Sequence, residues 1–248
     1  MNLTLNKKQF NDYFLSPVNK LTNSGTLILD EKSITTLTHN SEGGDTIVLY
    51  GYMKADTGLK EPYKLNLPDI KRLTQMLDCI DEDELKLTIA SNSISYKSPN
   101  LKFTYHLWED SLAQVSILNP NKINKLTFDC EFDLTPKKIS DILKASMVVP
   151  WPSDANKIYF YTKDNLVYGE LTDKTIANLD SISFTISDEY DGKDIKDVLP
   201  ISLEVFRLFS GLKIDNIRVK INTTLKTLLF EIKEENLVLK YIISSLVK

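Results

Sequence analysis

Few residues of this chain have the types and spacing that covalent catalysis requires. His39 and His106 lie in unlike local settings, and neither stands beside a serine or cysteine that could act as a nucleophile. The eight glycines form neither G-x-x-x-x-G-K-S/T nor G-x-G-x-x-G, the two loop patterns that cradle nucleotide phosphates. Cys79 and Cys130 have no cysteine or histidine neighbour at metal-ligand spacing. The sequence therefore predicts a protein that is not an enzyme.

Two acidic clusters have a composition that suits divalent cations. They are Asp81–Glu84 and Asp188–Asp194, whose carboxylates could gather around Mg²⁺ or Ca²⁺. The second cluster lacks the twelve-residue loop and terminal glutamate of an EF-hand, and solvated turns are commonly acidic in any case. We therefore expect neither a metal nor a cofactor, and a metal-dependent hydrolase is the less favoured alternative.

The composition is that of an ordinary globular chain, with 42% apolar and 26% charged residues among 248. No apolar stretch approaches the roughly 20 residues that a membrane helix needs, and the polar N-terminus resembles neither a signal peptide nor a transit peptide. The two cysteines fit reduced thiols, so we expect a cytoplasmic protein. Because the net charge is −4, any attraction to nucleic acid must come from a local basic surface.

Basic residues recur on the exposed faces of the predicted helices. In the third helix Lys137 and Lys144 share a face with Asp141, opposite an apolar stripe that includes Ile139 and is predicted to extend to Met147. Exposed helix faces are commonly rich in lysine, but four such helices on one side of two sheets would make a continuous basic surface. The candidate basic positions are Lys7, Lys8, Lys71, Arg72, Lys137, Lys138, Lys144 and Arg207.

The elements that carry these residues form an internal repeat. Four times a leucine is followed by a helix-start signal and an amphipathic turn. These leucines are Leu5, Leu67, Leu134 and Leu199, at spacings of 62, 67 and 65 residues. Two or three short alternating segments follow each helix, as expected of half-buried antiparallel strands. The pattern predicts an α+β protein of two similar domains, built from antiparallel sheets with the helices gathered on one face.

The expected elements have definite limits. Asn6 caps a first helix that Pro17 interrupts, Pro68 is the first residue of the second helix, and Thr135 caps the third. The fourth helix is expected at 202–212. The expected strands are 25–30, 33–38, 45–53, 85–89, 94–97, 101–108, 126–132, 158–163, 166–172, 181–187, 217–221, 225–233 and 237–244. The expected domains are 1–110 and 126–248, joined by a connector at 111–125.

Two passages carry a resemblance to a known family. The segment Ile182–Gly192, followed by a short strand and a helix, and the ending Asn236–Ile243 resemble the DNA sliding clamps, the ring-shaped processivity factors of polymerases. The second half is most similar to the clamp of T-even-like bacteriophages. The Leu-Lys-Tyr run at Leu239 also resembles the last strand of the eukaryotic clamp, proliferating cell nuclear antigen.

The resemblance implies the DNA clamp fold and a ring that tethers the replicative polymerase to double-stranded DNA without regard to base sequence. It also implies an ATP-driven clamp loader, the C-terminal tail of a DNA polymerase as a partner, and the host cytoplasm if the source is viral. Helix geometry independently favours a homotrimer, because twelve helices of about 10 Å each enclose a hole near 28 Å, whereas the eight helices of a dimer leave about 15 Å.

The resemblance also implies three groups of site residues. The basic positions above would face DNA across water. The subunit interface would pair two strands that contain Leu101, Phe103, Tyr105, Leu107, Ile182, Phe184 and Ile186. The pocket for a partner peptide would contain Leu37, Ile47, Val115, Ile117, Leu118, Leu239 and Ile242. The apolar residues in the connector favour such a pocket, although they could equally fasten the connector to its sheet. A viral structural or host-interaction protein with the same two-domain plan is the other alternative.

Overall fold

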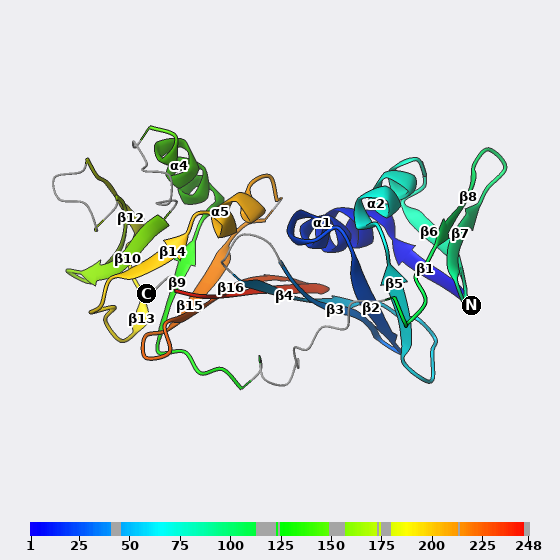
Figure 1. Cartoon of the computed structure of the whole chain (residues 1–248), viewed down its shortest axis with the longest axis horizontal. Coiled ribbons are helices and arrows are strands. Elements are labelled where there is room, and N and C mark those ends of the chain that lie inside the picture. Colours follow the sequence, from blue (N-terminus) through cyan, green and yellow to red (C-terminus); the bar gives the residue numbers. More distant parts are fainter. Residues whose placement is uncertain are drawn as a thin grey trace. The chain divides into compact units, whose positions relative to one another are not determined.

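The computed structural model describes residues 1–40, 46–112, 123, 125–148, 157–172, 174, 180–212 and 214–245. The chain divides into two compact units. Unit 1 comprises Met1–Asn40, Val48–Asn124 and Lys233–Lys240, and unit 2 comprises Ser41–Ile47, Lys125–Ile232 and Tyr241–Lys248. In each half of the chain a strand, a helix and three further strands follow one another twice (Figure 1).

The first half of the chain contains two of these repeats. The first consists of β1 (Asn2–Asn6), the π-helical segment η1 (Lys8–Leu15), α1 (Ser16–Leu21), β2 (Gly25–Asp30), β3 (Ser33–His39) and β4 (Ile47–Lys54). The second consists of β5 (Tyr63–Leu67), α2 (Ile70–Asp78), β6 (Glu84–Ala90), β7 (Ser93–Lys97) and β8 (Lys102–His106).

The second half of the chain has the same order of elements. The third repeat consists of β9 (Cys130–Leu134), α4 (Pro136–Ser146), β10 (Lys157–Lys163), β11 (Leu166–Leu171) and β12 (Ile182–Ser187). A short strand, β13 (Asp191–Gly192), pairs with β9. The fourth repeat consists of β14 (Leu199–Ser202), α5 (Glu204–Phe209), β15 (Ile217–Asn222), β16 (Thr227–Glu234) and β17 (Leu237–Ser244).

The first strand of each repeat pairs with the other repeat of its unit. In unit 1, β1 pairs with β6 and β5 pairs with β2; in unit 2, β9 pairs with β15 and β14 pairs with β10, all antiparallel. The four leucines that mark the repeat in the sequence, Leu5, Leu67, Leu134 and Leu199, lie on these first strands and are at most 6% exposed. The leucines of the sequence repeat therefore mark the strands through which the two repeats of a unit pair with each other.

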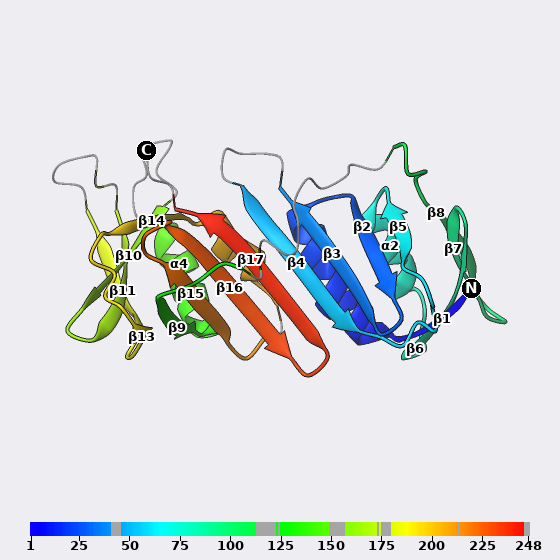
Figure 2. The ribbon, with the colours of Figure 1, turned by 90° about the horizontal axis from the view of Figure 1, so that it is seen from below.

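The helices of each unit lie against one face of its strands. Figure 1 shows α1 beside α2, and α4 beside α5, and Figure 2 shows strands β2, β3 and β4 crossing in front of η1 and α1. The helices begin where the sequence supplies caps: the Thr135 hydroxyl accepts a hydrogen bond from the Lys138 amide (3.3 Å), and the Asp69 carboxylate accepts one from the Arg72 amide (2.8 Å).

The buried faces of the helices and strands form the cores. In unit 2 the ring of Phe160 packs edge-to-face on those of Phe132 and Phe206, at centroid distances of 5.8 and 6.2 Å. Phe230 extends this cluster from Phe206, at 6.0 Å. Burying each side chain of this size contributes about 1.5–3 kcal/mol, so these rings stabilise the core of unit 2.

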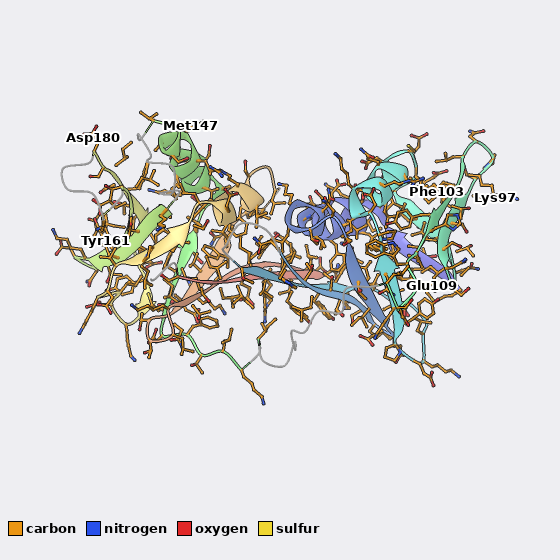
Figure 3. The ribbon with its side chains drawn as sticks, in the orientation of Figure 1. Lys97, Phe103, Glu109, Met147, Tyr161 and Asp180 are labelled. Carbon is orange, nitrogen blue, oxygen red and sulfur yellow. The ribbon has the colours of Figure 1, made fainter. Side chains whose placement is uncertain are left out.

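Several sequence predictions are corrected by the structure. A strand precedes each helix, and of these strands β1 and β5 were not expected, whereas β14 is the short strand expected between Gly192 and the fourth helix. Pro68 lies before the cap Asp69, so α2 begins at Ile70 rather than at the proline. Met147 is 79% exposed and does not join the buried stripe, because α4 ends at Ser146 and turns Met147 outward (Figure 3).

The first helix also differs from the prediction, because it continues through Pro17 to Leu21. The Ser16 amide donates to the Asn11 carbonyl, a widened turn that ends η1, and Pro17 then occupies the first turn of α1, where no amide donor is needed. The fourth helix, Glu204–Phe209, is shorter than the predicted 202–212. None of the helices in the described ranges has the length and hydrophobicity of a membrane-spanning segment.

Candidate nucleic-acid interface and subunit edges

The helices of unit 1 present basic side chains away from the core. On α2, Lys71 and Arg72 are exposed, whereas Leu73 and Leu77 on the opposite face are fully buried. On η1, Lys8 is exposed, with its ammonium 5.6 Å from the centre of the Tyr13 ring. The amphipathic pattern that buries the leucines thus determines which way the cations face.

Helix α4 of unit 2 presents a similar face. Lys137 and Lys144 are exposed, and Ile139 and Ile142 are at most 3% exposed. Within the part of the chain that the structure describes, no carboxylate lies within ion-pair distance of either lysine. The same is true of Lys8, Lys71 and Arg72. These five cations therefore remain available to an external anion such as phosphate.

Three other predicted DNA-facing residues already bind neighbouring groups. The Lys7 ammonium donates to the carbonyl oxygens of Asp78 and Ile80 at the end of α2. The Lys138 ammonium donates to the Thr185 carbonyl on β12, and Arg207 pairs with Glu204 one turn away on α5. Their assignment to a DNA-facing surface stays a prediction, but their cations are less available than the five above.

The strands predicted to form the subunit interface lie at sheet edges. Among the described residues, β8 pairs only with β7, and β12 pairs only with β11, so each strand has one unpaired side. Of the predicted interface residues, Tyr105, Leu107 and Ile186 are buried. The half-buried ones are Leu101, Phe103, Ile182 and Phe184. Each edge thus combines unpaired backbone groups with apolar side chains that are partly open to solvent, which favours strand addition.

The predicted peptide pocket is described only in part. Ile47 and Leu239 are 2% exposed, and Leu37 and Ile242 are half-buried. The three connector positions, Val115, Ile117 and Leu118, lie outside the described residues. The peptide pocket therefore stays a prediction.

Unit 2 contains an open pocket that no sequence motif signalled. Its volume is about 650 Å³, and the buried side chains of Ile195 and Leu199 contribute to its lining. Lys196 and Lys226 also line it, with no ion-pair partner among the described residues. The segments that form it are far apart in the sequence, so periodicity could not have predicted it.

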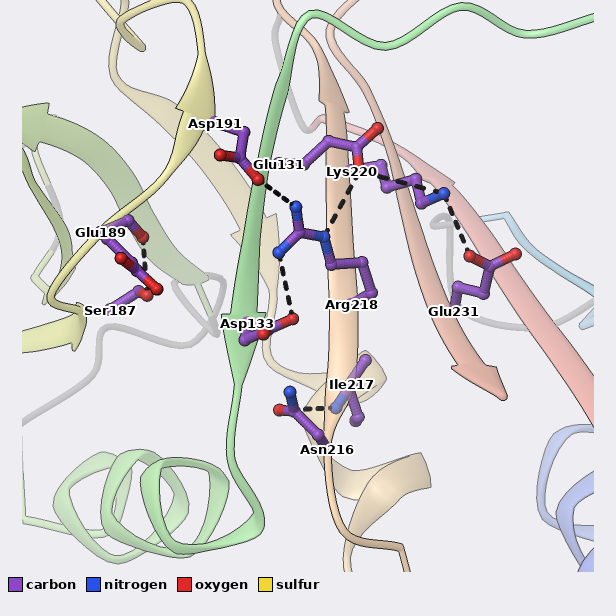
Figure 4. Close-up of polar contacts among 10 residues, drawn as sticks. All are labelled: Glu131, Asp133, Ser187, Glu189, Asp191, Asn216, Ile217, Arg218, Lys220 and Glu231. Atoms are coloured by element: carbon purple, nitrogen blue, oxygen red, sulfur yellow. Dashed lines mark hydrogen bonds and ion pairs between the residues drawn. The ribbon is translucent and has the colours of Figure 1, made fainter. Parts of the chain in front are cut away.

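One residue of the acidic cluster Asp188–Asp194, Asp191, joins an ion-pair network around Arg218. The Arg218 guanidinium binds Asp191 (2.5 Å), Asp133 (3.3 Å) and Glu131 (3.3 Å), as Figure 4 shows. Burial alone would lower the pKa of Arg218, but these hydrogen bonds raise it. The described residues contain no group of three or more His, Cys, Asp or Glu side chains arranged to hold a metal ion.

In the other acidic cluster, Glu82 accepts a hydrogen bond from the Tyr96 hydroxyl (2.8 Å). This contact fastens the turn before β6 to strand β7, so one carboxylate of the cluster has a structural partner.

Comparisons with known proteins agree on the fold. No family model and no curated protein matches the sequence. Among solved structures, the chain is similar to Archaeoglobus fulgidus PCNA bound to the C-terminal region of FEN-1, with a TM-score of 0.78 at 10% identity over 100% of this chain and 98% of that chain. It is also similar to the proliferating cellular nuclear antigen of Entamoeba histolytica, with a TM-score of 0.75 at 14% identity over 99% and 98% of the two chains.

A bacterial protein gives the same result. The DNA polymerase III beta subunit of Thermotoga maritima matches with a TM-score of 0.74 at 10% identity, over 100% of this chain and 66% of that longer chain. Identities this low establish the architecture alone. The chain has the DNA clamp fold, an α+β arrangement of antiparallel sheets and few helices.

Proposed function

We propose that this protein is a subunit of a sliding clamp, a ring that encircles duplex DNA and tethers a replicative polymerase to it. The observation that carries the proposal is that cations without ion-pair partners in the described residues lie on helices of both units, in a chain of net charge −4. Lys71 and Arg72 are examples on α2, and Lys137 and Lys144 on α4. Attraction of such cations to phosphate is independent of base sequence, which suits a protein that slides.

The ring is a head-to-tail homotrimer in this proposal. Among the described residues, β8 lies at one end of a four-stranded sheet of unit 1, whose other end is β1, and β12 lies at one end of a four-stranded sheet of unit 2, whose other end is β14. Pairing of two different edges is a heterologous contact, and such contacts close into rings when the rotation permits. Four repeats per chain supply twelve helices to a trimer, enough to surround a hole of about 28 Å.

The protein catalyses no reaction in this proposal, and its partners do the chemistry. An ATP-driven clamp loader opens the ring, and a polymerase docks through its C-terminal tail. The archaeal PCNA structure with a bound C-terminal region of FEN-1 supports tail docking by analogy. The proposed pocket is formed by the connector residues Val115, Ile117 and Leu118 together with Leu37, Ile47, Leu239 and Ile242. The same proposal includes two domains, 1–110 and 126–248, joined by a connector at 111–125. It also includes a T-even-like phage source and action in the host cytoplasm.

Topological retention on DNA tests encirclement without any partner protein. In a Cys79→Ser background, Thr104→Cys on β8 and Ser183→Cys on β12 place one thiol on each proposed edge. A bis-maleimide added in the presence of circular plasmid should join three chains into a ring that stays on the DNA in detergent. Cutting the plasmid once should release it.

Two results would contradict the proposal. Cross-linked trimers that are equally lost from circular and linear DNA would show that the ring does not encircle DNA. Light scattering that finds only monomer or a stable dimer at micromolar concentration would exclude the trimer itself. Neither alternative, a virion protein or a metal-dependent hydrolase, is favoured by any arrangement of the described residues.

A further inference from the structure

The hairpin that ends in the edge strand β8 carries two positive charges beside its turn. Lys97 and Lys102 lie directly opposite each other in the β7–β8 hairpin, and both are exposed (Figure 3 labels Lys97). No carboxylate of the described residues lies within ion-pair distance of either ammonium. Like charges at directly opposed positions destabilise a hairpin, so this pair has an unfavourable interaction that an external anion would relieve.

The turn between these lysines is held by hydrogen bonds. The Leu101 amide donates to the Ser98 hydroxyl (3.1 Å), and the Ser98 amide donates to the Leu101 carbonyl (2.8 Å). Lys97 and Lys102 flank this closed turn. Their backbone positions are therefore fixed beside the unpaired edge.

The unpaired edge of unit 2 carries negative charges at one end. Strand β12 ends at Ser187, and Asp188 and Glu189 follow, both exposed. The Ser187 hydroxyl donates to the Glu189 carbonyl (2.8 Å, Figure 4), which keeps this segment beside the end of the strand. No cation of the described residues lies within ion-pair distance of either carboxylate.

We propose that Lys97 and Lys102 of one copy meet Asp188 and Glu189 of the next copy, and that this contact sets an antiparallel orientation for the junction. The inference rests on the proposed ring and adds what orients and regulates its closure. In an antiparallel pairing the start of β8 lies opposite the end of β12. This brings the two lysines of one copy close to the two carboxylates of the next.

A parallel pairing would bring like charges together instead. Glu109, which follows the other end of β8, is exposed and would then approach Asp188 and Glu189 (Figure 3 labels Glu109). The apolar residues of the two edges give no such discrimination, because hydrophobic contact is non-directional. The charges thus exclude the wrong orientation as well as favouring the right one.

Closure that depends on exposed charges is sensitive to salt. The Debye length falls from about 10 Å at 0.1 M to about 3 Å at 1 M ionic strength. Raising the salt concentration should therefore weaken the junction, whereas a purely apolar junction would be unchanged or strengthened.

Charge reversal and charge exchange test this contact. Sedimentation analysis of the full chain in 0.1 M salt would compare the wild type, Lys97→Glu/Lys102→Glu, Asp188→Lys/Glu189→Lys and the four-fold variant that exchanges both pairs. We expect each reversal to raise the concentration for half-dissociation by about tenfold or more, since like charges then oppose at every junction. The four-fold variant should return to within about threefold of the wild type.

A matched control separates local contact from net charge. Lys60→Glu/Lys233→Glu makes the same change of charge as Lys97→Glu/Lys102→Glu, at exposed positions that lie neither on β8 or β12 nor on a strand that pairs with them, and should leave the oligomer unchanged. If the four-fold variant dissociates as readily as the two reversal variants, the proposed charge contact is wrong, but the proposal of a ring is unaffected. A wild type that never assembles would instead overturn the proposed ring.

Discussion

The hydroxyl of Tyr105 donates a hydrogen bond to the Asp69 carbonyl (2.8 Å) and accepts one from the Asp69 amide (3.0 Å). Tyr105 lies on the edge strand β8, and Asp69 caps helix α2 through its bond to the Arg72 amide. One side chain therefore joins the proposed subunit edge to the helix that carries Lys71 and Arg72. Burial raises the pKa of Tyr105 to about 12, so this hydroxyl remains a donor at any physiological pH.

Replacing Tyr105 by phenylalanine should lower the free energy of unfolding by about 1–3 kcal/mol, because it leaves the Asp69 amide without its partner, whereas the Asp69 carbonyl keeps its bond from the Leu73 amide (3.1 Å). Urea unfolding measures the loss. Tyr63→Phe is a matched control, since the Tyr63 hydroxyl makes one exposed hydrogen bond to the Ala90 carbonyl (3.3 Å). Its effect should stay within about 0.5 kcal/mol. Equal losses of unfolding free energy in the two variants would mean that the hydrogen bonds between Tyr105 and Asp69 contribute no more than the exposed bond of Tyr63.

Replacing Lys71, Lys137 and Lys144 by glutamate should leave the ring assembled but weaken its retention on circular DNA and its stimulation of a polymerase. The defect should grow as salt is lowered, because attraction to phosphate is then least screened and its reversal is most repulsive. Retention on plasmid at 50 and 200 mM salt measures the effect.

The control for that variant is Lys60→Glu/Lys163→Glu/Lys233→Glu, which changes the net charge equally at exposed positions outside the helices. It should retain most of the binding. If both triple variants lose retention to the same extent, net charge rather than the helix surface is responsible, and the assignment of the DNA-facing residues is wrong.

Replacing Ile117 by aspartate should abolish binding of a peptide from the C-terminus of the cognate polymerase without dissociating the trimer. The wild-type affinity should be weak, because a few buried side chains at about 1.5–3 kcal/mol each must offset the ordering of the peptide. Fluorescence anisotropy measures it, with Ser116→Asp as the control for charge in the connector. An unchanged affinity in Ile117→Asp would place the pocket elsewhere.

The two cysteines should differ in reactivity towards Ellman's reagent at pH 8. Cys79 is exposed, whereas burial, together with the charges of Asp129, Asp194 and Glu131, raises the pKa of Cys130 to about 12. One thiol should react in the native protein and two in 8 M urea. Rapid reaction of both thiols in the native state would contradict the buried position of Cys130.

The raised pKa of Cys130 also predicts a pH dependence of stability. The unfolded thiol ionises near pH 8.5, whereas the folded thiol stays protonated up to about pH 12. The contribution of Cys130 is therefore fully present below pH 8.5 and is lost as the pH rises from there towards 12. Cys130→Ala should remove this part of the alkaline decline, as urea unfolding at pH 8 and 10 would measure.

The strands with local partners were predictable from the sequence. Gly25–Asp30 was predicted without error, and 217–221 to within one residue, because alternation and nearby turns specify a hairpin locally. The first strands of the repeats were missed where they are short or polar, as in Asn2–Asn6. Their partners lie far along the chain, as for β1 and β6, and a pattern within one segment carries no information about such pairing.

The candidate site was predictable to a similar extent. Helical periodicity predicted that Lys71 and Lys137 would be exposed, and both are. Periodicity did not predict that the ammonium of Lys138 reaches a carbonyl of β12, because the reach of a long side chain depends on tertiary packing. The pairing of Arg218 with three carboxylates was missed for the same reason.

The interlocking of β1 with β6 also constrains the order of events during synthesis. A ribosome releases the chain from its N-terminus, so β1 emerges before β6 and has no partner until Glu84–Ala90 has followed. The hairpin of β2 and β3 needs no such delay, since its strands are neighbours in the sequence. Unit 1 should therefore form the β2–β3 hairpin before β1 can pair, and a nascent chain that stalls before Glu84 should remain open to proteolysis at Asn2–Asn6.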